Sequence, residues 1–456
     1  MLLLPTSTPD DIAVPSIDVE EVFGADTVAR AERFERFHYV NWALGQIVLL
    51  VILAIYARRG VAFMRESSAG PIGTGMLLGM LGLAIVWLVK LPFRIAAHWW
   101  NRRYDQTDLN YLDWIVEDWA VLAAGFISLC IALVIVMGLA RRLGERWWLP
   151  GAATFVAIAA LFSFVLPYLD FGVTKPLRDE TLVESADRYE RELGLPDIPL
   201  RVEEVSEYTE LANAYAFGIG PSRRIVFWDT LLMDPFTVEQ QKVVLAHELG
   251  HHSGNHLAEG LGWFAIFAVP GAWILMRATR GRGGMGRPEA VPLALVVVAV
   301  VQLAAAPAQN WISRRMETEA DWVAHRLARD PASLEQVMVN FSHTSLGDPA
   351  PPDWVQVLLG SHPTLAQRVA TARAYAARGA PEPRPLGQRV LGAGAAFGRR
   401  EPAALRGDRA ALDAVRGSDD DRDHAVPEVR PDLVHVRGAH PGPGFGDRAA
   451  DAGRDL

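Results

Sequence analysis

Cysteine is almost absent from this chain of 456 residues, which contains only Cys130. One cysteine cannot form an intrachain disulfide, and Cys130 lies inside a long apolar run, so we expect a small membrane residue rather than a catalytic thiol. The chain also lacks a stripe of basic residues, and its formal net charge is −9, so nucleic acid is not an expected partner. The amino terminus is acidic and contains proline. It lacks the basic region that opens a signal peptide, so no cleavable signal peptide is expected.

Charged residues are missing from several long segments, although half of all residues are hydrophobic. About six runs are long enough, alone or with their flanking residues, to cross the hydrocarbon core of a bilayer. They are residues 42–57, 75–89, 119–140, 147–169, 260–276 and 290–313. A transporter would need ionisable groups or broken helices inside its spans, and these runs carry no charge. The sequence therefore predicts a multi-pass membrane protein that is not a transporter.

The motif at residues 247–251 reads His-Glu-Leu-Gly-His. Histidines four residues apart lie on one face of a helix, so His247 and His251 can reach the same metal ion. Glu248 is close enough to take a proton from the attacking water without being a ligand. Thr237 and Gln240 are spaced as a capping box, which predicts that the helix begins there. This pattern favours a zinc hydrolase.

The third metal ligand separates the zinc hydrolase families. Metzincins place a histidine six residues after the second one, but this chain has Leu257 there, with His256 one residue early. The other common arrangement takes a glutamate from a second helix. Glu317 and Asp321 are four residues apart and share a helical face, so Glu317 can bind zinc while Asp321 supports a ligand histidine. Glu319 projects elsewhere on that helix and is the weaker ligand candidate.

Several motifs together resemble the CAAX prenyl protease 1 type of integral-membrane zinc metalloendopeptidase. They are the motif at 247–251, Ser313-Arg314-x-x-Glu317-x-x-Ala320-Asp321 and Ser361-His362-Pro363. Leu91-Pro92-Phe93, Asn213-Ala214-Tyr215 and the run 224–232 agree. The resemblance covers roughly residues 28–377. The related HtpX-type proteases share the zinc motifs but are shorter, and they would not explain the long amino-terminal membrane region.

The resemblance implies one zinc ion per chain, bound by His247, His251 and Glu317, with Glu248 as the general base. It implies that His362 stabilises the developing oxyanion, although a histidine that precedes a proline-started helix could also be a simple cap. The same source implies that Asn213, Ala214 and Tyr215 are candidate substrate-binding residues. Arg368, six residues after His362, could form a salt bridge to the site and is a further candidate for substrate binding. An edge strand at 213–215 would pair with an extended peptide, and an ordinary amphipathic strand is the alternative.

The predicted fold is mainly α. A polytopic bundle of about six spans carries a zinc metalloprotease domain of helices plus a small β-sheet, split across the last two spans. We expect a disordered acidic segment at 1–27, four spans in 28–169 and a soluble insert with the sheet and zinc helix at 170–259. After these we expect two spans at 260–313, the rest of the catalytic domain at 314–377 and a disordered tail at 378–456.

The expected activity is hydrolysis of peptide bonds in extended or membrane-associated peptides, either in CAAX-type processing or in membrane-protein quality control. Peptides, membrane proteins and the lipid bilayer are the expected partners. The alternative is a non-proteolytic membrane zinc protein that senses or scaffolds, which would need the ligands but not Glu248. Charge near the span ends does not decide the orientation. The resemblance implies a cytoplasmic catalytic side, in the cell membrane if the source is bacterial.

Overall fold

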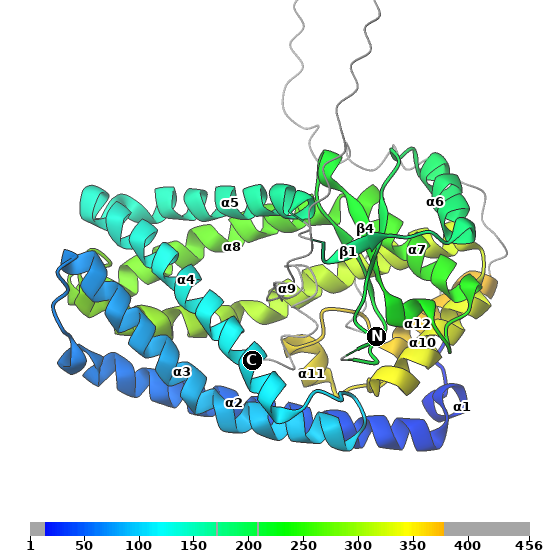
Figure 1. The fold of residues 1–456 in the computed structure, drawn as a ribbon, viewed down its shortest axis with the longest axis horizontal. Helices are drawn as coiled ribbons and strands as arrows, with labels where there is room; N and C mark the ends of the chain where they lie inside the picture. Colours follow the sequence, from blue (N-terminus) through cyan, green and yellow to red (C-terminus); the bar gives the residue numbers. More distant parts are fainter. Residues whose placement is uncertain (1–13, 170–171, 208, 378–456) are drawn as a thin grey trace, which may run out of the picture. The chain divides into compact units, whose positions relative to one another are not determined.

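The computed structural model describes residues 14–169, 172–207 and 209–377, which lie in one unit of the chain (Figure 1). The α-helices are α1 Val19–Phe23, α2 Ala25–Arg59, α3 Gly70–Arg103, α4 Tyr111–Leu143, α5 Trp148–Val165, α6 Glu180–Leu193, α7 Val238–Ser253, α8 His256–Thr279, α9 Val291–Ala328, α10 Pro331–Ser345, α11 Asp353–Leu358 and α12 Leu365–Ala377. The strands are β1 Thr174–Pro176, β2 Leu200–Glu203, β3 Ala214–Phe217 and β4 Arg224–Trp228. Short 3₁₀ turns join several of them, among them η2 Gly144–Trp147 between α4 and α5.

Five apolar helical stretches are long enough to cross a membrane, and one of them provides two helices. This stretch, Tyr111–Tyr168, includes the turn η2, where Gly144 adopts a φ of 57°. Because that left-handed conformation suits glycine and ends α4, the chain folds back into α5 (Figure 1). The crossing helices are then α2, α3, α4, α5, α8 and α9, which match the predicted apolar runs. The predicted polytopic bundle is confirmed.

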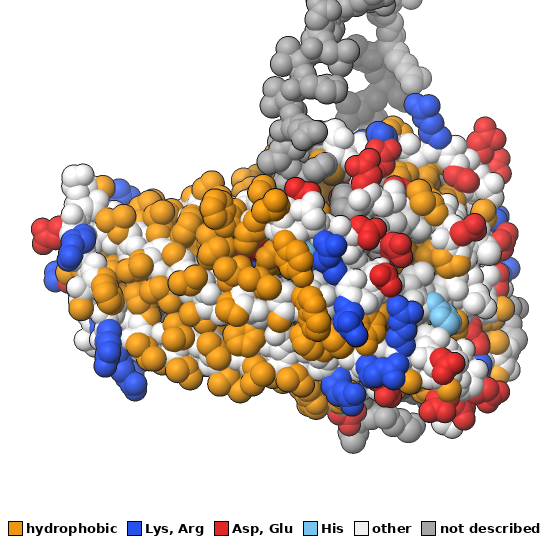
Figure 2. Space-filling view, turned by 60° about the horizontal axis from the view of Figure 1, so that its bottom comes forward, with side chains coloured by type: hydrophobic (Ala, Val, Ile, Leu, Met, Phe, Trp, Pro, Cys, Tyr) orange, Lys and Arg blue, Asp and Glu red, His pale blue; other side chains and the backbone are white. Residues whose placement is uncertain are grey.

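Apolar side chains cover the outside of the helical block. Figure 2 shows them as a continuous surface, with charged side chains gathered at its far end and over the other part of the molecule. Leu88, Ile127 and Ile266 are each about 60% exposed (62%, 63% and 59%). An apolar surface this large would be unfavourable in water, whereas lipid tails match it. The protein is therefore a multi-pass membrane protein.

The small sheet has the strand order β1-β2-β4-β3. β2 and β4 are parallel, β1 is antiparallel to β2, and β3 is antiparallel to β4 with Tyr215 opposite Val226. β3 lies at one edge, so one side of its backbone pairs with no described strand. In Figure 1 the sheet lies beside α7, at the end of the helical block where α9 leaves it.

The soluble core contains residues from the amino terminus as well as from the sheet and from α7, α10 and α12. Phe23 and Val28 are buried in the same apolar cluster as Phe227 and Leu245. Residues 1–27 were expected to be disordered. In the described part of this segment the structure instead has the helix α1 and the start of α2. Asp18 accepts a hydrogen bond from the Glu21 backbone at 3.1 Å and begins α1, while the acidic residues of α1 point to solvent. Because these acidic residues dominate the composition of the segment, the sequence did not indicate that Phe23 would be buried.

Two of the expected domain boundaries lie inside helices. The boundary between residues 259 and 260 lies inside α8, which begins at His256, and the boundary between 313 and 314 lies inside the continuous helix α9. The same helices continue from the bilayer into the soluble part, so neither point ends a helix. The expected tail at 378–456 lies outside the described residues.

Candidate active site

The histidine motif lies on α7, whose predicted capping box is present. The Gln240 backbone donates to Thr237 Oγ1 at 3.4 Å, and the Thr237 backbone donates to Gln240 Oε1 at 3.1 Å. One helical turn then separates His247 from His251, and their Nε2 atoms lie 3.1 Å apart. Both rings therefore point at a common position, as the spacing predicts.

Glu317 reaches the same position from α9. Its carboxylate oxygens lie 3.2 Å from His247 Nε2 and 3.6 Å from His251 Nε2, and one ligand atom from each of the three residues falls within 4.8 Å of the others. Glu317 is buried, and its Oε2 atom makes no hydrogen bond. A buried carboxylate oxygen without a donor, beside two imidazole nitrogens, fits a divalent metal ion that accepts nitrogen and oxygen ligands. These three residues could hold a metal.

Asp321 lies behind His247, as predicted. His247 Nδ1 and Asp321 Oδ1 are 2.9 Å apart, and Arg368 donates to both Asp321 oxygens at 2.9 and 2.6 Å. A carboxylate at Nδ1 leaves Nε2 directed toward the metal position. Burial alone lowers the pKa of His247, but the neighbouring carboxylates of Asp321 and Glu317 raise the pKa to about 10. The carboxylates thus favour positive charge here, which a bound cation would supply.

His251 has a different environment. Burial lowers its pKa well below the ordinary value, so its ring is neutral and suited to bind a metal. Its Nδ1 atom lies 3.0 Å from His256 Nδ1, and His256 Nε2 lies 3.5 Å from Glu319 Oε2. Glu319 was expected to project away from the site, and instead it approaches it through His256. His252 faces the sheet, where its ring contacts the Arg224 carbonyl at 3.0 Å.

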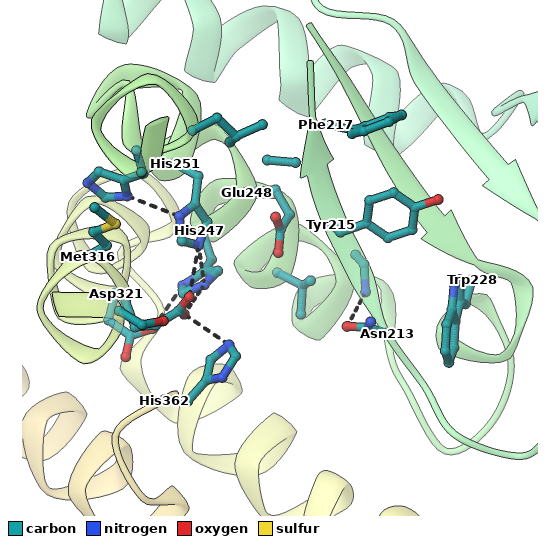
Figure 3. Close-up of a pocket in the computed structure, with 18 of the residues that line it drawn as sticks. Asn213, Tyr215, Phe217, Trp228, His247, Glu248, His251, Met316, Asp321 and His362 are labelled. Atoms are coloured by element: carbon teal, nitrogen blue, oxygen red, sulfur yellow. Dashed lines mark hydrogen bonds and ion pairs between the residues drawn. The ribbon is translucent and has the colours of Figure 1, made fainter. Parts of the chain in front are cut away.

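A cavity of about 670 Å³ lies between the metal position and β3. Figure 3 shows the Glu248 carboxylate in this space, between His247 and the strand. Glu248 is buried, and it lines the cavity together with Asn213, Ala214 and Tyr215. The Tyr215 side chain points away from Glu248 in Figure 3, and its hydroxyl donates to Glu203 Oε2 at 3.0 Å. The predicted general base and the predicted edge strand therefore share one cavity.

His362 enters the site on a loop that buried polar residues hold. Its Nε2 atom lies 3.3 Å from Glu317 Oε2, and its ring also contacts Ser361 Oγ. Gln356 donates to the His362 carbonyl at 2.6 Å, and Arg314 Nη1 donates to the Gln356 and Gly360 carbonyls. Arg314 was part of a recognised motif, but its support of this loop was not predicted, because the two segments are distant in sequence.

Arg368 also lines the cavity, although its guanidinium is engaged by Asp321. Its predicted salt bridge to the site is present, and direct substrate contact stays a prediction. The sequence analysis missed the apolar cavity walls, which carry no motif. They come from α5, from the 3₁₀ turn that follows it, from α8 and from α10: Phe162, Leu166, Leu261, Phe264, Leu334, Val337, Met338 and Phe341.

Comparison with known proteins agrees with this geometry. Residues 176–376, which include every residue of the metal position, match peptidase family M48. A metalloprotease of Bacillus subtilis, YhfN, is 26% identical over 284 residues, and the match covers 59% of this chain and 66% of the relative. A CAAX prenyl protease 1 homolog of Oryza sativa is 24% identical over 70% of this chain and 82% of the relative.

The chain is similar to membrane metalloproteases of the CAAX protease and HtpX type. The crystal structure of Ste24p from S. mikatae shares its fold, with a TM-score of 0.65 and 19% identity over 76% of this chain and 88% of that chain. The predicted family and fold class are confirmed. The match to YhfN spans slightly less than two thirds of that relative's length.

Gly250 allows α7 and α9 to approach closely. A Cβ atom added there would lie 2.9 Å from the Ala320 Cα atom and 3.1 Å from its carbonyl oxygen. Gly250→Ala should therefore push the histidine pair away from Glu317, destabilising the fold by about 1–3 kcal/mol and weakening metal binding. Thermal unfolding and zinc titration would measure both effects. Gly138→Ala on α4, where a Cβ meets nothing within 4 Å, is the control, and equal behaviour of the two variants would contradict the prediction.

Proposed function

We propose that this protein is a zinc-dependent endopeptidase that cleaves extended peptides presented at the membrane surface. The observation that carries the proposal is the shared cavity. His247, His251 and Glu317 converge within 4.8 Å on one side of it, and the edge strand β3 forms another side. A metal site beside an open strand edge is suited to hold a peptide backbone across the reacting position.

In this proposal His247, His251 and Glu317 bind one zinc ion, leaving a coordination position open. Zinc, when bound, polarises the scissile carbonyl and lowers the pKa of water. Glu248 takes the proton of the attacking water and passes it to the leaving amine. His362, which lies below the metal position in Figure 3, donates a hydrogen bond to the developing oxyanion. Asp321 keeps His247 in the tautomer that binds metal.

The cavity walls support a preference for apolar substrates. Phe162, Leu261 and Phe264 belong to crossing helices, and Val337 and Phe341 belong to α10. Because apolar residues flank the metal position on both sides, bulky apolar groups on either side of the scissile bond would be buried there. The α5 and α8 wall continues into the bilayer, which supports entry of membrane-anchored peptides. CAAX-type substrates and damaged membrane proteins both meet this description.

We propose that the catalytic end lies in the cytoplasm and that, if the source is bacterial, the protein lies in the cell membrane. The helix α1 packs in the same core as α7, which supports its place on the catalytic side of the membrane. The test is protease accessibility or cysteine labelling of an added cysteine near residue 187 of α6, in intact cells and in inverted vesicles. Labelling from outside intact cells would contradict the assignment.

The enzymatic proposal is tested with the full chain purified in detergent. We expect about one zinc per chain and cleavage of apolar, extended peptides that stops with a chelator and returns with added zinc. Peptides of equal length with charged residues around the scissile bond should be poorer substrates. Chelator-resistant cleavage, or zinc-loaded protein that cleaves neither class of peptide, would contradict the proposal.

The edge of β3 provides a specific test of peptide binding. The Trp228 backbone donates to the Asn213 carbonyl, so in this antiparallel pair the backbone groups of Ala216 face away from β4. Ala216→Pro removes the N–H group that would pair with a substrate, and kcat/KM should fall roughly tenfold, the value of one backbone hydrogen bond, with zinc content unchanged. Ala216→Val keeps the N–H group and is the matched control. Equal loss in both variants would argue against strand pairing.

A further inference from the structure

Three residues extend from the back of His251 to the protein surface, and the proposed reaction does not use them. His251 Nδ1 lies 3.0 Å from His256 Nδ1, and His256 Nε2 lies 3.5 Å from Glu319 Oε2. Arg315 Nε donates to Glu319 Oε1 at 3.2 Å. We call His256, Glu319 and Arg315 the His256 chain. It starts at a buried ring and ends at a half-exposed ion pair.

The positions of the protons along this chain follow from the metal site. A His251 ring that binds a metal through Nε2 carries its proton on Nδ1. That proton faces His256 Nδ1, which must then be the acceptor, so the proton of a neutral His256 lies on Nε2 and faces Glu319. The opposite arrangement would leave His256 Nε2 as a lone pair facing a carboxylate, which is repulsive. Glu319 therefore favours, through His256, the His251 tautomer that binds metal.

The local fold holds His256 in this position. It is 4% exposed and is the first residue of α8, directly after Asn255, whose φ of 55° turns the chain back toward the site. A Cβ atom at Gly254 would lie 2.3 Å from His256 Nε2, so only glycine leaves room for the ring there. Each ligand histidine thus has support from α9: Asp321 contacts His247 directly, and Glu319 contacts His251 through His256.

We propose that His256 and Glu319 are positioning residues that orient His251 for metal binding. The inference rests on the proposed metal site and goes beyond it, since it assigns a role to two residues outside the ligand set. Partners of ligand histidines commonly contribute 10- to 100-fold to metal affinity, so loss of His256 should weaken zinc binding by roughly that factor.

The test compares three variants of the full chain in detergent. His256→Leu removes the hydrogen bond with His251 and the ion-pair contact with Glu319. His256→Gln can accept from His251 through its carbonyl oxygen and donate to Glu319 through its amide, so it should recover most of the lost affinity. His252→Leu removes a neighbouring buried imidazole that contacts Arg224 rather than His251, and it is the control for general damage to α7. Zinc affinity is measured by competition with a chromophoric chelator, and ligand geometry by the visible absorption of cobalt-loaded protein.

We expect zinc affinity to fall 10- to 100-fold in His256→Leu, with shifted cobalt bands, while His252→Leu keeps both near those of the unmodified protein. Unchanged affinity and bands in His256→Leu, or equal weakening in His256→Gln, would overturn the inference. If His256→Leu does not fold, Glu319→Leu at the more exposed end should show the same loss, and an unchanged affinity there would overturn it. Failure of the unmodified protein to bind zinc would instead overturn the proposed function.

Discussion

Glu248→Gln should reduce kcat by roughly a hundred- to ten-thousandfold, the usual contribution of general acid–base catalysis. Glutamine keeps the size of the side chain and its place in the cavity beside β3. It cannot take a proton from water, so the chemical step slows while binding is retained. Peptide cleavage under single-turnover conditions and zinc content by elemental analysis would measure the two effects separately.

The variant should still bind about one zinc per chain, because Glu248 is not among the three residues that could hold the metal. A chelator control on the same preparation excludes contaminating proteases. Ordinary cleavage by zinc-loaded Glu248→Gln would remove Glu248 from the proposed mechanism. It would also favour the alternative in which the metal site serves a sensor or scaffold, since that reading needs the ligands alone.

Glu317→Ala should abolish stable zinc binding. The substitution removes the carboxylate from the set of three converging residues. The oxygens of this carboxylate lie 3.2 Å from His247 Nε2 and 3.6 Å from His251 Nε2. Losing a direct ligand should cost more affinity than the roughly 10- to 100-fold that supporting residues contribute. Zinc titration of the purified protein, followed by peptide cleavage at saturating zinc, would measure the loss.

Glu319→Ala is the matched control, because it removes the same side chain two residues along α9. It should load fully with zinc in excess and weaken binding only at limiting zinc, as expected for a residue that acts through His256. Full zinc binding by Glu317→Ala together with its loss in Glu319→Ala would contradict the ligand assignment. It would exchange the roles of the two glutamates.

The convergence of His247, His251 and Glu317 could be predicted because the spacing within each helix is local. Two histidines one turn apart share a helical face whatever surrounds the helix, and Glu317 and Asp321 repeat that spacing on α9. The capping box at Thr237 is equally local, and it is present. Apolar runs predicted the crossing helices for a similar reason, since hydrocarbon thickness sets a minimum length that any such helix must meet.

The outer contacts could not be predicted from spacing. Glu319 lies between Glu317 and Asp321 on α9, and helical geometry alone turns it away from both. It reaches the site only because Asn255 turns the chain back and places His256 between α7 and α9. Arg314 likewise supports the His362 loop through carbonyls more than forty residues away, at Gln356 and Gly360.

By itself the sequence predicted the proposed chemistry, with two histidines and a glutamate as metal ligands and a second glutamate for proton transfer. It also determined that the long apolar helices belong in lipid. The tertiary structure decided what surrounds that chemistry. Helices α5, α8 and α10 become cavity walls, and the amino-terminal helix α1 joins the catalytic core. The physical reason is the distance along the chain over which each effect acts. Motif spacing fixes side-chain positions within one or two helical turns, whereas the cavity walls and the contacts of Glu319 and Arg314 arise from packing between segments that are far apart in the chain.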